Sequence, residues 1–379
     1  MKDFASRKGW STLVVGLWLC SLLSACGPRS GGYPYSELDT PEQRVYNGFA
    51  FLKKERLADA QREFEQALLL DPKCSPAYRG IGLVYGRKGD FPRAFDAMEQ
   101  ARTAGKDRLD QALAEVGMMS LFRMQRTDGW LHRVKASFAR AVSLEKQLPE
   151  AYLELGVAYK YAYRFREAEE AFNEVLRINS ILVYEAGEEI NLLKKIERAA
   201  PRSTFGKELV LERWITRGET ATLIVKETNI VEVLSLKMEE EGGSGERVQA
   251  PALPPDVVDY PMRDDIQAVL RLNIRGLGTL YDGSFGADQS MTRAAFATVM
   301  ADVLTRVTEK PELYQRYAGI DSPFLDVRGN SPYFSSIMIC CEWAGIMGGW
   351  GGYFHPMETI SGVDALLVLR EAEKKLKGN

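Results

Sequence analysis

The most regular feature of the chain is a recurrence of small and large apolar positions every 34 residues across residues 41–199. Gly48 and Gly82 are 34 residues apart, and Phe64 and Met98 stand 16 residues after them. Polar residues fill most positions between, at the spacing of helices with one apolar face. A period of roughly 20 to 50 residues is typical of helix pairs that stack into an array. The pattern therefore predicts helical hairpins here and a mainly α fold.

Later copies follow the same plan. The copy around Gly156 keeps the spacing, whereas in the copy around Gly117 the aromatic Phe138 stands 21 residues on instead of 16. This longer spacing predicts an insertion near residues 127–130. The stretch 183–199 predicts a terminal helix that caps the apolar face of the last repeat.

These copies resemble the tetratricopeptide repeat. The resemblance implies a solenoid of antiparallel helix pairs whose first helices line a concave groove for a peptide or protein, with a plain spacer as the alternative. The residues expected to point into this groove are Val45, Phe49, Leu52, Arg79, Leu83, Arg87, Leu153, Val157, Lys160 and Tyr161. The family's Lys and Asn pattern for clamping carboxylates is not matched, so recognition of chaperone tails is not expected.

The C-terminal half carries a second recurrence, at an offset of 69 residues. The positions that match without a gap are Gly276 with Gly345, Gly283 with Gly352, Phe285 with Phe354, Met291 with Ile360, and Thr292 with Ser361. Apolar stretches at 266–270 and 337–341 lead to the first pair and predict short helices. Two copies of one unit of loop and helix are therefore expected. The stretch 208–215 is compatible with a strand or a helix.

The segments of this recurrence resemble the S-layer homology (SLH) family. They are Phe324–Val327, Gly345–Gly348, Gly352–Pro356, Asp282–Phe285, Met291–Ala294 and an earlier opening motif, Ile215–Glu219. The resemblance implies a small helical domain over 205–379 with three pseudo-repeats about a pseudo-threefold axis. A partial motif at 205–232 is expected before a linker at 239–255 and full motifs at 256–308 and 322–375.

Each copy opens a helix with Thr or Ser, and two of the openings also carry an arginine. Thr216 and Thr292 are good N-caps, and Glu219 completes a capping box. Arg217 and Arg293 lack such an explanation, because a cation in the first turn opposes the helix macrodipole at a cost of about 0.3–1 kcal/mol. We therefore expect these arginines to hold an anion at the helix N-terminus. The alternative is a solvated or internally paired arginine.

The SLH resemblance implies that this anion belongs to a cell-wall glycan. The residues expected to bind it are Thr216, Arg217, Glu219, Thr292, Arg293, Trp343 and Gly345. The third opening, at Ser361, has no arginine, and Ala295 replaces the usual acid in the second, so one or two working pockets are expected. Trp343, Trp350 and Tyr353 are expected either to stack on sugar rings or to fill the small core.

The N-terminus has the pattern of an export signal. Positive residues precede an apolar stretch at 13–23 that is shorter than the about 20 residues of a transmembrane span. The following Leu23–Gly27 resembles a bacterial lipobox, which implies a signal peptide at 1–25 and lipidation of Cys26; an ordinary cleaved signal peptide is the alternative. The stretch 26–40, rich in Gly, Pro and Ser, predicts a flexible tether. A lipid-anchored location in the cell envelope is expected, at the outer membrane and facing the periplasm.

Composition and charge limit the classes of function to be expected. The formal net charge of −3 over 379 residues gives no support for nucleic-acid binding. Two histidines and five irregularly spaced cysteines predict neither a metal site nor a cofactor. The sequence offers no nucleophile with its base and no recognisable carboxylate pair, so no enzymatic activity is expected.

Together these features predict a non-enzymatic envelope lipoprotein. Its lipid anchors it in a membrane, its SLH region binds wall polymer, and its helical array binds an unidentified protein or peptide. The alternative is an assembly factor for secretion or pilus subunits, in which the array is the active part and the SLH region only localises it.

Overall fold

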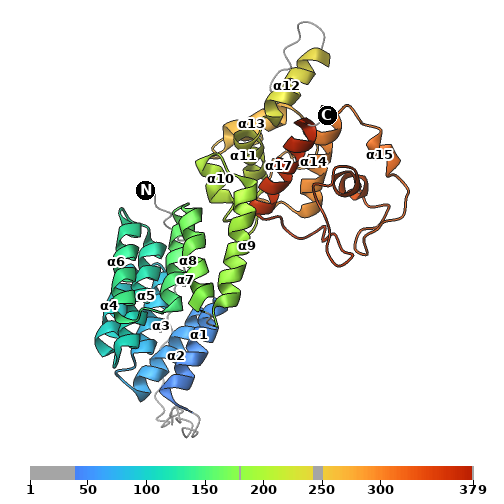
Figure 1. The fold of residues 1–379 in the computed structure, drawn as a ribbon. Coiled ribbons are helices and arrows are strands. Elements are labelled where there is room, and N and C mark those ends of the chain that lie inside the picture. Colours follow the sequence, from blue (N-terminus) through green and yellow to red (C-terminus); the bar gives the residue numbers. More distant parts are fainter. Residues whose placement is uncertain (1–38, 179–180, 242–250, 378–379) are drawn as a thin grey trace, which may run out of the picture.

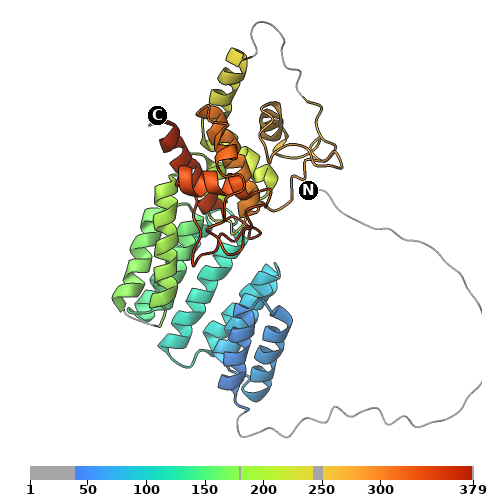
Figure 2. The same cartoon turned by 90° about the vertical axis from the view of Figure 1, so that its right-hand side faces the viewer.

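The computed structural model of the chain describes residues 39–178, 181–241 and 251–377. Helices dominate this part of the chain, and extended segments pair only in isolated bridges. The mainly α fold class is therefore confirmed. Figures 1 and 2 show an N-terminal helical array and a C-terminal lobe, joined through α9 (Val183–Ala199). In the described ranges, no helix combines the length and the apolarity that a membrane crossing requires.

The array consists of four helical hairpins. Their helices are α1 (Pro41–Lys53) with α2 (Leu57–Leu70), α3 (Ser75–Arg87) with α4 (Phe91–Ala104), α5 (Arg108–Gln125) with α6 (Trp130–Leu144), and α7 (Pro149–Tyr161) with α8 (Phe165–Ile178). The first helices of successive hairpins pack side by side, and α9 packs on α8. An exposed ion pair of 3.0 Å between Lys53 and Glu185 also joins the end of α1 to the start of α9.

Close packing of the helices explains why glycine stands at these recurring positions. The ring of Phe64 lies between α1 and α3, where a Cβ atom on Gly48 would come within 2.5 Å of it and one on Gly80 within 2.3 Å. Gly156 approaches the ring of Phe172 in the same way, at 2.5 Å. Any side chain larger than hydrogen would push these helices apart, so the sequence period records close helix packing.

The longer third copy extends a helix more than it extends a loop. Helix α5 has 18 residues, whereas α1, α3 and α7 have 13 each. It ends at Arg126, which adopts the left-handed conformation with a φ of 49°. The insertion expected near 127–130 is therefore largely an additional turn of α5.

The C-terminal lobe consists of shorter helices and long loops. Its elements are α10 (Thr204–Leu209), α11 (Arg217–Glu227), α12 (Ile230–Glu241), α13 (Arg263–Arg271), α14 (Arg293–Val307), α15 (Leu313–Arg316), α16 (Phe334–Met338), the π-helix η1 (Ile339–Trp343) and α17 (Gly362–Lys377). Residues 239–241, expected in a linker, form the last turn of α12. The rest of that expected linker lies mostly outside the described residues.

Three backbone segments meet at the centre of this lobe in a closed ring of hydrogen bonds. The N–H of Ile215 donates to the carbonyl of Ile360 (3.1 Å), that of Ile360 to Met291 (3.0 Å), and that of Met291 back to Ile215 (2.8 Å). All three side chains are buried, and each residue lies two positions before the first residue of a helix: α11, α14 or α17. These three segments are thus related by an approximate threefold arrangement of their backbone hydrogen bonds.

A buried ionic cluster fastens the array to the lobe. Arg370 on α17 donates to the carbonyl oxygens of Ala199 (2.9 Å) and Ala200 (3.1 Å) at the end of α9, and it pairs with Glu227. Glu227 also accepts hydrogen bonds from the backbone N–H (2.8 Å) and the hydroxyl (2.7 Å) of Ser203. Because both charges are buried and fully partnered, the cluster fixes the orientation of α9 against α11 and α17.

Candidate functional site

The N-terminal end of the array contains a cavity of about 510 Å³ on its concave face. Val45, Tyr46 and Phe49 of α1 give it an apolar wall, and Arg79 of α3 and Lys73 add positive charge to its lining. The structure therefore brings together three residues expected in the groove, Val45, Phe49 and Arg79. Tyr46 was not among them, although it is 72% exposed.

Arg79 is unusual among the charged groups of the array. Its guanidinium carbon lies 5.1 Å from the centre of the Phe49 ring, and its Nε atom is buried without a hydrogen-bond partner. Burial lowers the pKa of Arg79, and the more distant carboxylates of Glu150 and Asp110 offset this only in part. Within the described residues, no carboxylate lies within ion-pair distance of Arg79. Arg79 as a whole is half-buried, but its Nε donor is buried and unsatisfied, which is rare because buried polar groups are normally hydrogen-bonded.

The C-terminal end of the groove has its charges paired. Lys160 forms an ion pair with Glu189 of α9, and Arg123 pairs with Glu154 at 2.6 Å. The ring of Tyr161 lies beside these cations, with the guanidinium of Arg126 at 4.5 Å. Lys160 and Tyr161 are thus held in an internal cluster.

The remaining residues expected in the groove contribute to packing. Leu83 contacts the cores of the first two hairpins, and Val157 packs against the core that α9 shares with the C-terminal lobe. Arg87 pairs with Glu55 and reaches the carbonyl of Leu52 at 3.4 Å. Of the cations expected in the groove, Arg79 is therefore the one without an ion-pair partner among the described residues.

In the C-terminal lobe, the helix openings have the predicted capping geometry. The Thr216 hydroxyl accepts a hydrogen bond from the N–H of Glu219 (3.1 Å), and the Glu219 carboxylate accepts one from the N–H of Thr216 (2.7 Å). Thr292 accepts a hydrogen bond from the N–H of Ala295 at 3.2 Å. Thr216, Glu219 and Thr292 thus have a structural role at these positions, and their expected contact with a glycan stays a prediction.

The two opening arginines bind backbone oxygens of the next unit. Arg217 donates from Nε to Phe285 (2.9 Å), from Nη1 to Gly276 (2.6 Å) and from Nη2 to Gly278 (2.8 Å). The carbonyl oxygens supply the negative partial charge for which an external anion was expected. The arginine that opposes the macrodipole is therefore explained by contacts inside the chain.

Arg293 repeats this arrangement one unit later. It donates from Nε to Phe354 (3.0 Å) and from Nη2 to Gly348 (2.6 Å), and its guanidinium lies 4.9 Å from the centre of the Trp350 ring. Both arginines fix a loop whose other side is held by an aspartate that was not expected as a site residue. Asp256 accepts from the N–H of Phe285 (2.8 Å), and Asp326 accepts from that of Phe354 (2.9 Å). The repeated Asp-Val pairs at 256 and 326 could have revealed this role.

The third opening lacks arginine for a steric reason. The N–H of Gly362 donates to the carbonyl of Glu212 at 3.1 Å, as the other openings do to their neighbours. A Cβ atom on Gly362 would lie 1.8 Å from the carbonyl oxygen of Leu209. The first unit, at 205–232, is truncated, and α10 occupies the space beside position 362. No side chain therefore fits at that position.

A hollow of about 590 Å³ lies beside the second opening. Arg293, Gly345 and Gly348 line one side of it, and Asp364 and Glu371 of α17 line the other. Arg198 of α9 also contributes, so the array takes part in this hollow. The structure thus brings together the predicted residues Arg293 and Gly345.

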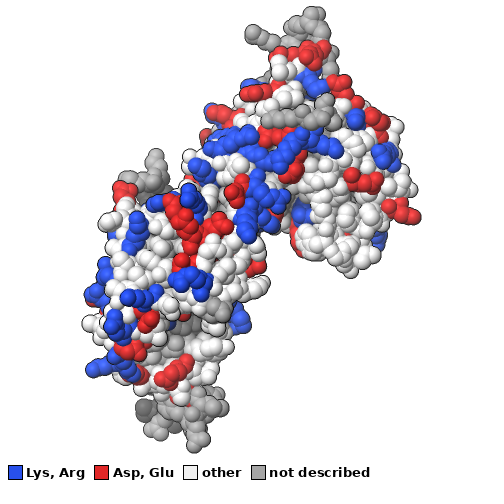
Figure 3. All heavy atoms as spheres, in the orientation of Figure 1, with Lys and Arg blue, Asp and Glu red and all other residues white. Residues whose placement is uncertain are grey.

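The aromatic residues near the third loop separate into two groups. Trp343 lies in η1, where the ammonium groups of Lys310 (5.5 Å) and Lys375 (5.4 Å) are close to the centre of its ring, and it is not among the residues that line the hollow. Trp350, in contrast, is 53% exposed and stacks on His355. Exposed apolar side chains of the same region are those of Leu325, Tyr353 and Met357. In Figure 3 the lower part of the C-terminal lobe carries few charged side chains.

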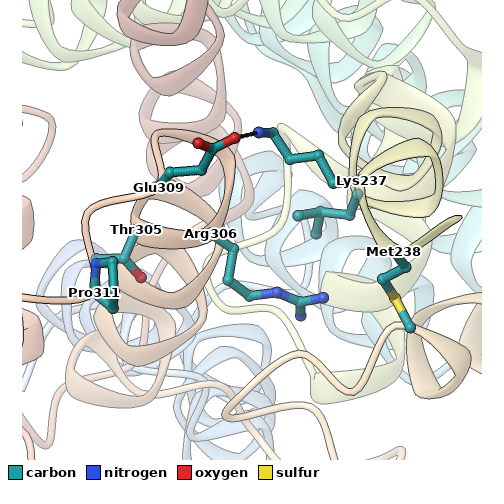
Figure 4. Close-up of a pocket in the computed structure, with 7 residues that line it drawn as sticks. Lys237, Met238, Thr305, Arg306, Glu309 and Pro311 are labelled. Atoms are coloured by element: carbon teal, nitrogen blue, oxygen red, sulfur yellow. Dashed lines mark hydrogen bonds and ion pairs between the residues drawn. The ribbon is translucent and has the colours of Figure 1, made fainter. Parts of the chain in front are cut away.

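A further pocket of about 370 Å³ lies between α12 and α14 (Figure 4). Its charged residues have partners inside the chain: Lys237 pairs with Glu309, and Arg306 donates to the carbonyl of Leu272 at 2.7 Å. Cys340, elsewhere in the lobe, is buried, and burial raises the pKa of its thiol. The described part of the chain contains no cluster of metal-binding side chains.

Comparison with known proteins bears on the array. The family model of the tetratricopeptide repeat matches residues 149–181, which contain α7 and α8. The chain contains a tetratricopeptide repeat. This match and the stacked hairpins support a tetratricopeptide solenoid, a fold that indicates protein–protein interaction.

Other comparisons add little. No curated protein matches the chain. One similar solved structure, described as "Functional Characterization of Pseudomonas Aeruginosa pilF", is 15% identical. The match covers 54% of this chain and 93% of that one, and the two superpose with a TM-score of 0.32. A likeness at this level supports no inference about function.

Proposed function

We propose that the chain is a non-enzymatic envelope scaffold, which holds a partner polypeptide in the groove of its array and a cell-wall glycan on its C-terminal lobe. The observation that carries the first half is the tetratricopeptide array with its cavity around Arg79. The cavity combines an apolar wall with an unpaired cation, which suits a polypeptide ligand better than a structural spacer. The buried cluster of Arg370 and Glu227 would transmit force between the two halves.

The hollow beside Arg293 supports the second half of the proposal. Its lining combines charged side chains, Arg198, Asp364 and Glu371, with backbone atoms at Gly345 and Gly348. Such a mixture of charged groups and backbone can hydrogen-bond to sugar hydroxyls. The exposed ring of Trp350, which Arg293 contacts, offers a flat surface next to it. We keep Gly345 as a glycan-binding residue. Arg293 lines the hollow but is fixed to the carbonyl oxygens of Phe354 and Gly348, so we assign it, like Arg217, to the architecture of the lobe.

Membrane attachment through Cys26 is part of the proposal and concerns residues outside the described ranges. Once a lipid holds the chain at a membrane, binding to the adjacent wall becomes effectively intramolecular. Even a weak affinity for glycan then suffices for a stable bridge. We propose the outer membrane, facing the periplasm, as the location.

A sedimentation assay with purified wall sacculi tests the glycan half. Trp350→Ala and Glu371→Gln in the full mature chain should each reduce cosedimentation at least fivefold. Tyr281→Ala is the matched control, because Tyr281 is an exposed aromatic residue of the preceding unit. Equal binding by all four proteins would overturn the placement of the glycan site. Release of soluble muropeptides by the wild type would contradict the non-enzymatic role.

A further inference from the structure

We infer that Arg79 receives an acidic side chain of the partner polypeptide, so that the N-terminal end of the groove selects an acidic residue beside an apolar one. This inference rests on the proposed function of the array and names the chemistry of its partner. It starts from the buried Nε atom of Arg79, which has no hydrogen-bond partner.

Among the described residues, the array supplies no ion-pair partner for the charge of Arg79. Burying a charge is costly unless it is paired, and the other groove cations meet this requirement through Glu55, Glu154 and Glu189. Arg79 contacts the ring of Phe49, which gives one of its faces a favourable neighbour but leaves its buried Nε donor without a hydrogen-bond partner. A carboxylate brought by a ligand would satisfy them.

The cavity fits a singly charged group better than a phosphate. Besides Arg79 and Lys73 it contains Lys106, whose charge is already paired with Asp71 at 2.9 Å. Glu42 and Asp110 also line the cavity and would repel a group with two negative charges. The balance of charges therefore favours a carboxylate.

The carboxylate should belong to a side chain and not to a chain end. Capture of a terminal carboxylate usually relies on free backbone N–H groups. At the start of α3, the N–H groups of Ala77 (3.1 Å) and Tyr78 (3.3 Å) already donate to Cys74, and Pro76 has none. The wall of Val45, Tyr46 and Phe49 adds space for an apolar neighbour of the acidic residue.

Four peptides and the full mature chain test this assignment. The probe is the acetylated and amidated peptide Ala-Ala-Phe-Glu-Ala-Ala, compared with versions that carry Gln or phosphoserine in place of Glu, and with a Gln version that has a free C-terminus. By fluorescence anisotropy, the Glu peptide should bind at least tenfold more tightly than each of the others. Arg79→Gln should remove that preference, whereas Arg87→Gln, which alters a cation already paired with Glu55, should keep it.

The other outcomes are equally informative. Equal binding of the Glu and Gln peptides would overturn the assignment of Arg79 while leaving the groove as a peptide site. Tighter binding of the phosphorylated or free-ended peptide would overturn the choice of a side-chain carboxylate. Failure of all four peptides to bind at millimolar concentration would count against both the inference and the proposed groove.

A second measurement does not depend on any ligand. Because the half-buried Arg79 has a buried Nε donor without a partner, Arg79→Met should raise the melting temperature of the free chain. A lower melting temperature would mean that the guanidinium is needed by the fold, and this would overturn the inference.

Discussion

Two arginines of this chain, Arg79 in the array and Arg217 in the C-terminal lobe, have similar surroundings and different partners. Each lies about 5 Å from the centre of a phenylalanine ring, 5.1 Å for Arg79 and 5.0 Å for Arg217, and burial lowers the pKa of both. All three guanidinium nitrogens of Arg217 donate to carbonyl oxygens, whereas the Nε of Arg79 has no partner. Contacts inside the fold therefore account for Arg217, whereas Arg79 calls for a ligand.

This difference shows how an arginine that has an architectural role can be distinguished from one that is available to bind a ligand. Arg217 recurs as Arg293, each time fixed to the loop of the following unit, as expected for an architectural contact. Arg79 has no charged counterpart in the neighbouring hairpin: it stands three residues before Gly82, and the residue three positions before Gly117 is the buried Ala114. A charge that the fold does not use is the better candidate for function.

The largest effect should come from Arg217→Ala. It removes three charge-assisted hydrogen bonds and leaves the carbonyl oxygens of Gly276, Gly278 and Phe285 without that partner, so we expect a loss of about 3–5 kcal/mol in unfolding free energy. Urea unfolding measures it. Arg213→Ala changes an exposed arginine nearby and should cost less than about 0.5 kcal/mol. Similar losses for the two variants would contradict the architectural role.

A smaller effect is expected for Gly362→Ala. The new methyl group would lie 1.8 Å from the carbonyl oxygen of Leu209, which should cost about 2–3 kcal/mol through overpacking. Gly187→Ala in α9 is the control, because nothing lies within 4 Å of its Cβ position, and it should be neutral or slightly stabilising. An unchanged unfolding midpoint for Gly362→Ala would contradict the steric explanation of the missing arginine.

The ionic cluster of Arg370 and Glu227 predicts that the unfolding free energy of the chain depends on pH. Although burial acts to raise the pKa of Glu227, hydrogen bonds from Arg202 and Ser203 and the charge of Arg370 lower it overall. A carboxyl whose pKa is lower in the folded state stabilises the protein above its unfolded pKa, and this contribution is lost as the pH falls through the folded pKa. Glu227→Gln should therefore weaken the dependence of the unfolding free energy on pH between 7 and about 3. Glu188→Gln, at an exposed position of α9, should leave it unchanged.

The smallest effect has the opposite sign. Arg79→Met should stabilise the free chain by about 1 kcal/mol, because it removes a buried donor that has no partner and keeps the apolar stem. Thermal unfolding measured by circular dichroism is the readout. Arg123→Met is the informative contrast, since Arg123 is paired with Glu154 and its loss should destabilise the chain.

Local patterns were enough to predict the array. The 34-residue period records contacts such as Gly48 against Phe64, which lie within one hairpin and repeat in the next, so one sequence carries several copies of the same information. The capping box of Thr216 and Glu219 was predictable for the same reason, because its partners are three residues apart.

The roles of the charged residues were not predictable in this way. The carbonyl partners of Arg217 lie 59 to 68 residues away along the chain, and backbone oxygens carry no sequence signal. The macrodipole indicated that the arginine needs a negative partner but could not say whether that partner is internal. Helix α12 was missed as well, since its acidic last turn at 239–241 resembles the following Gly-rich stretch in composition.

The most direct test of the binding role of Arg79 is a double-mutant cycle between this arginine and the acidic residue of the peptide ligand. Binding free energies of wild-type and Arg79→Gln chains for the Glu and Gln peptides, measured by calorimetry, give the coupling between the two groups. We predict a coupling of about 1.5–3 kcal/mol, as expected for a charge-assisted hydrogen bond in a buried site. A coupling near zero would contradict this role, even if all four pairs bind.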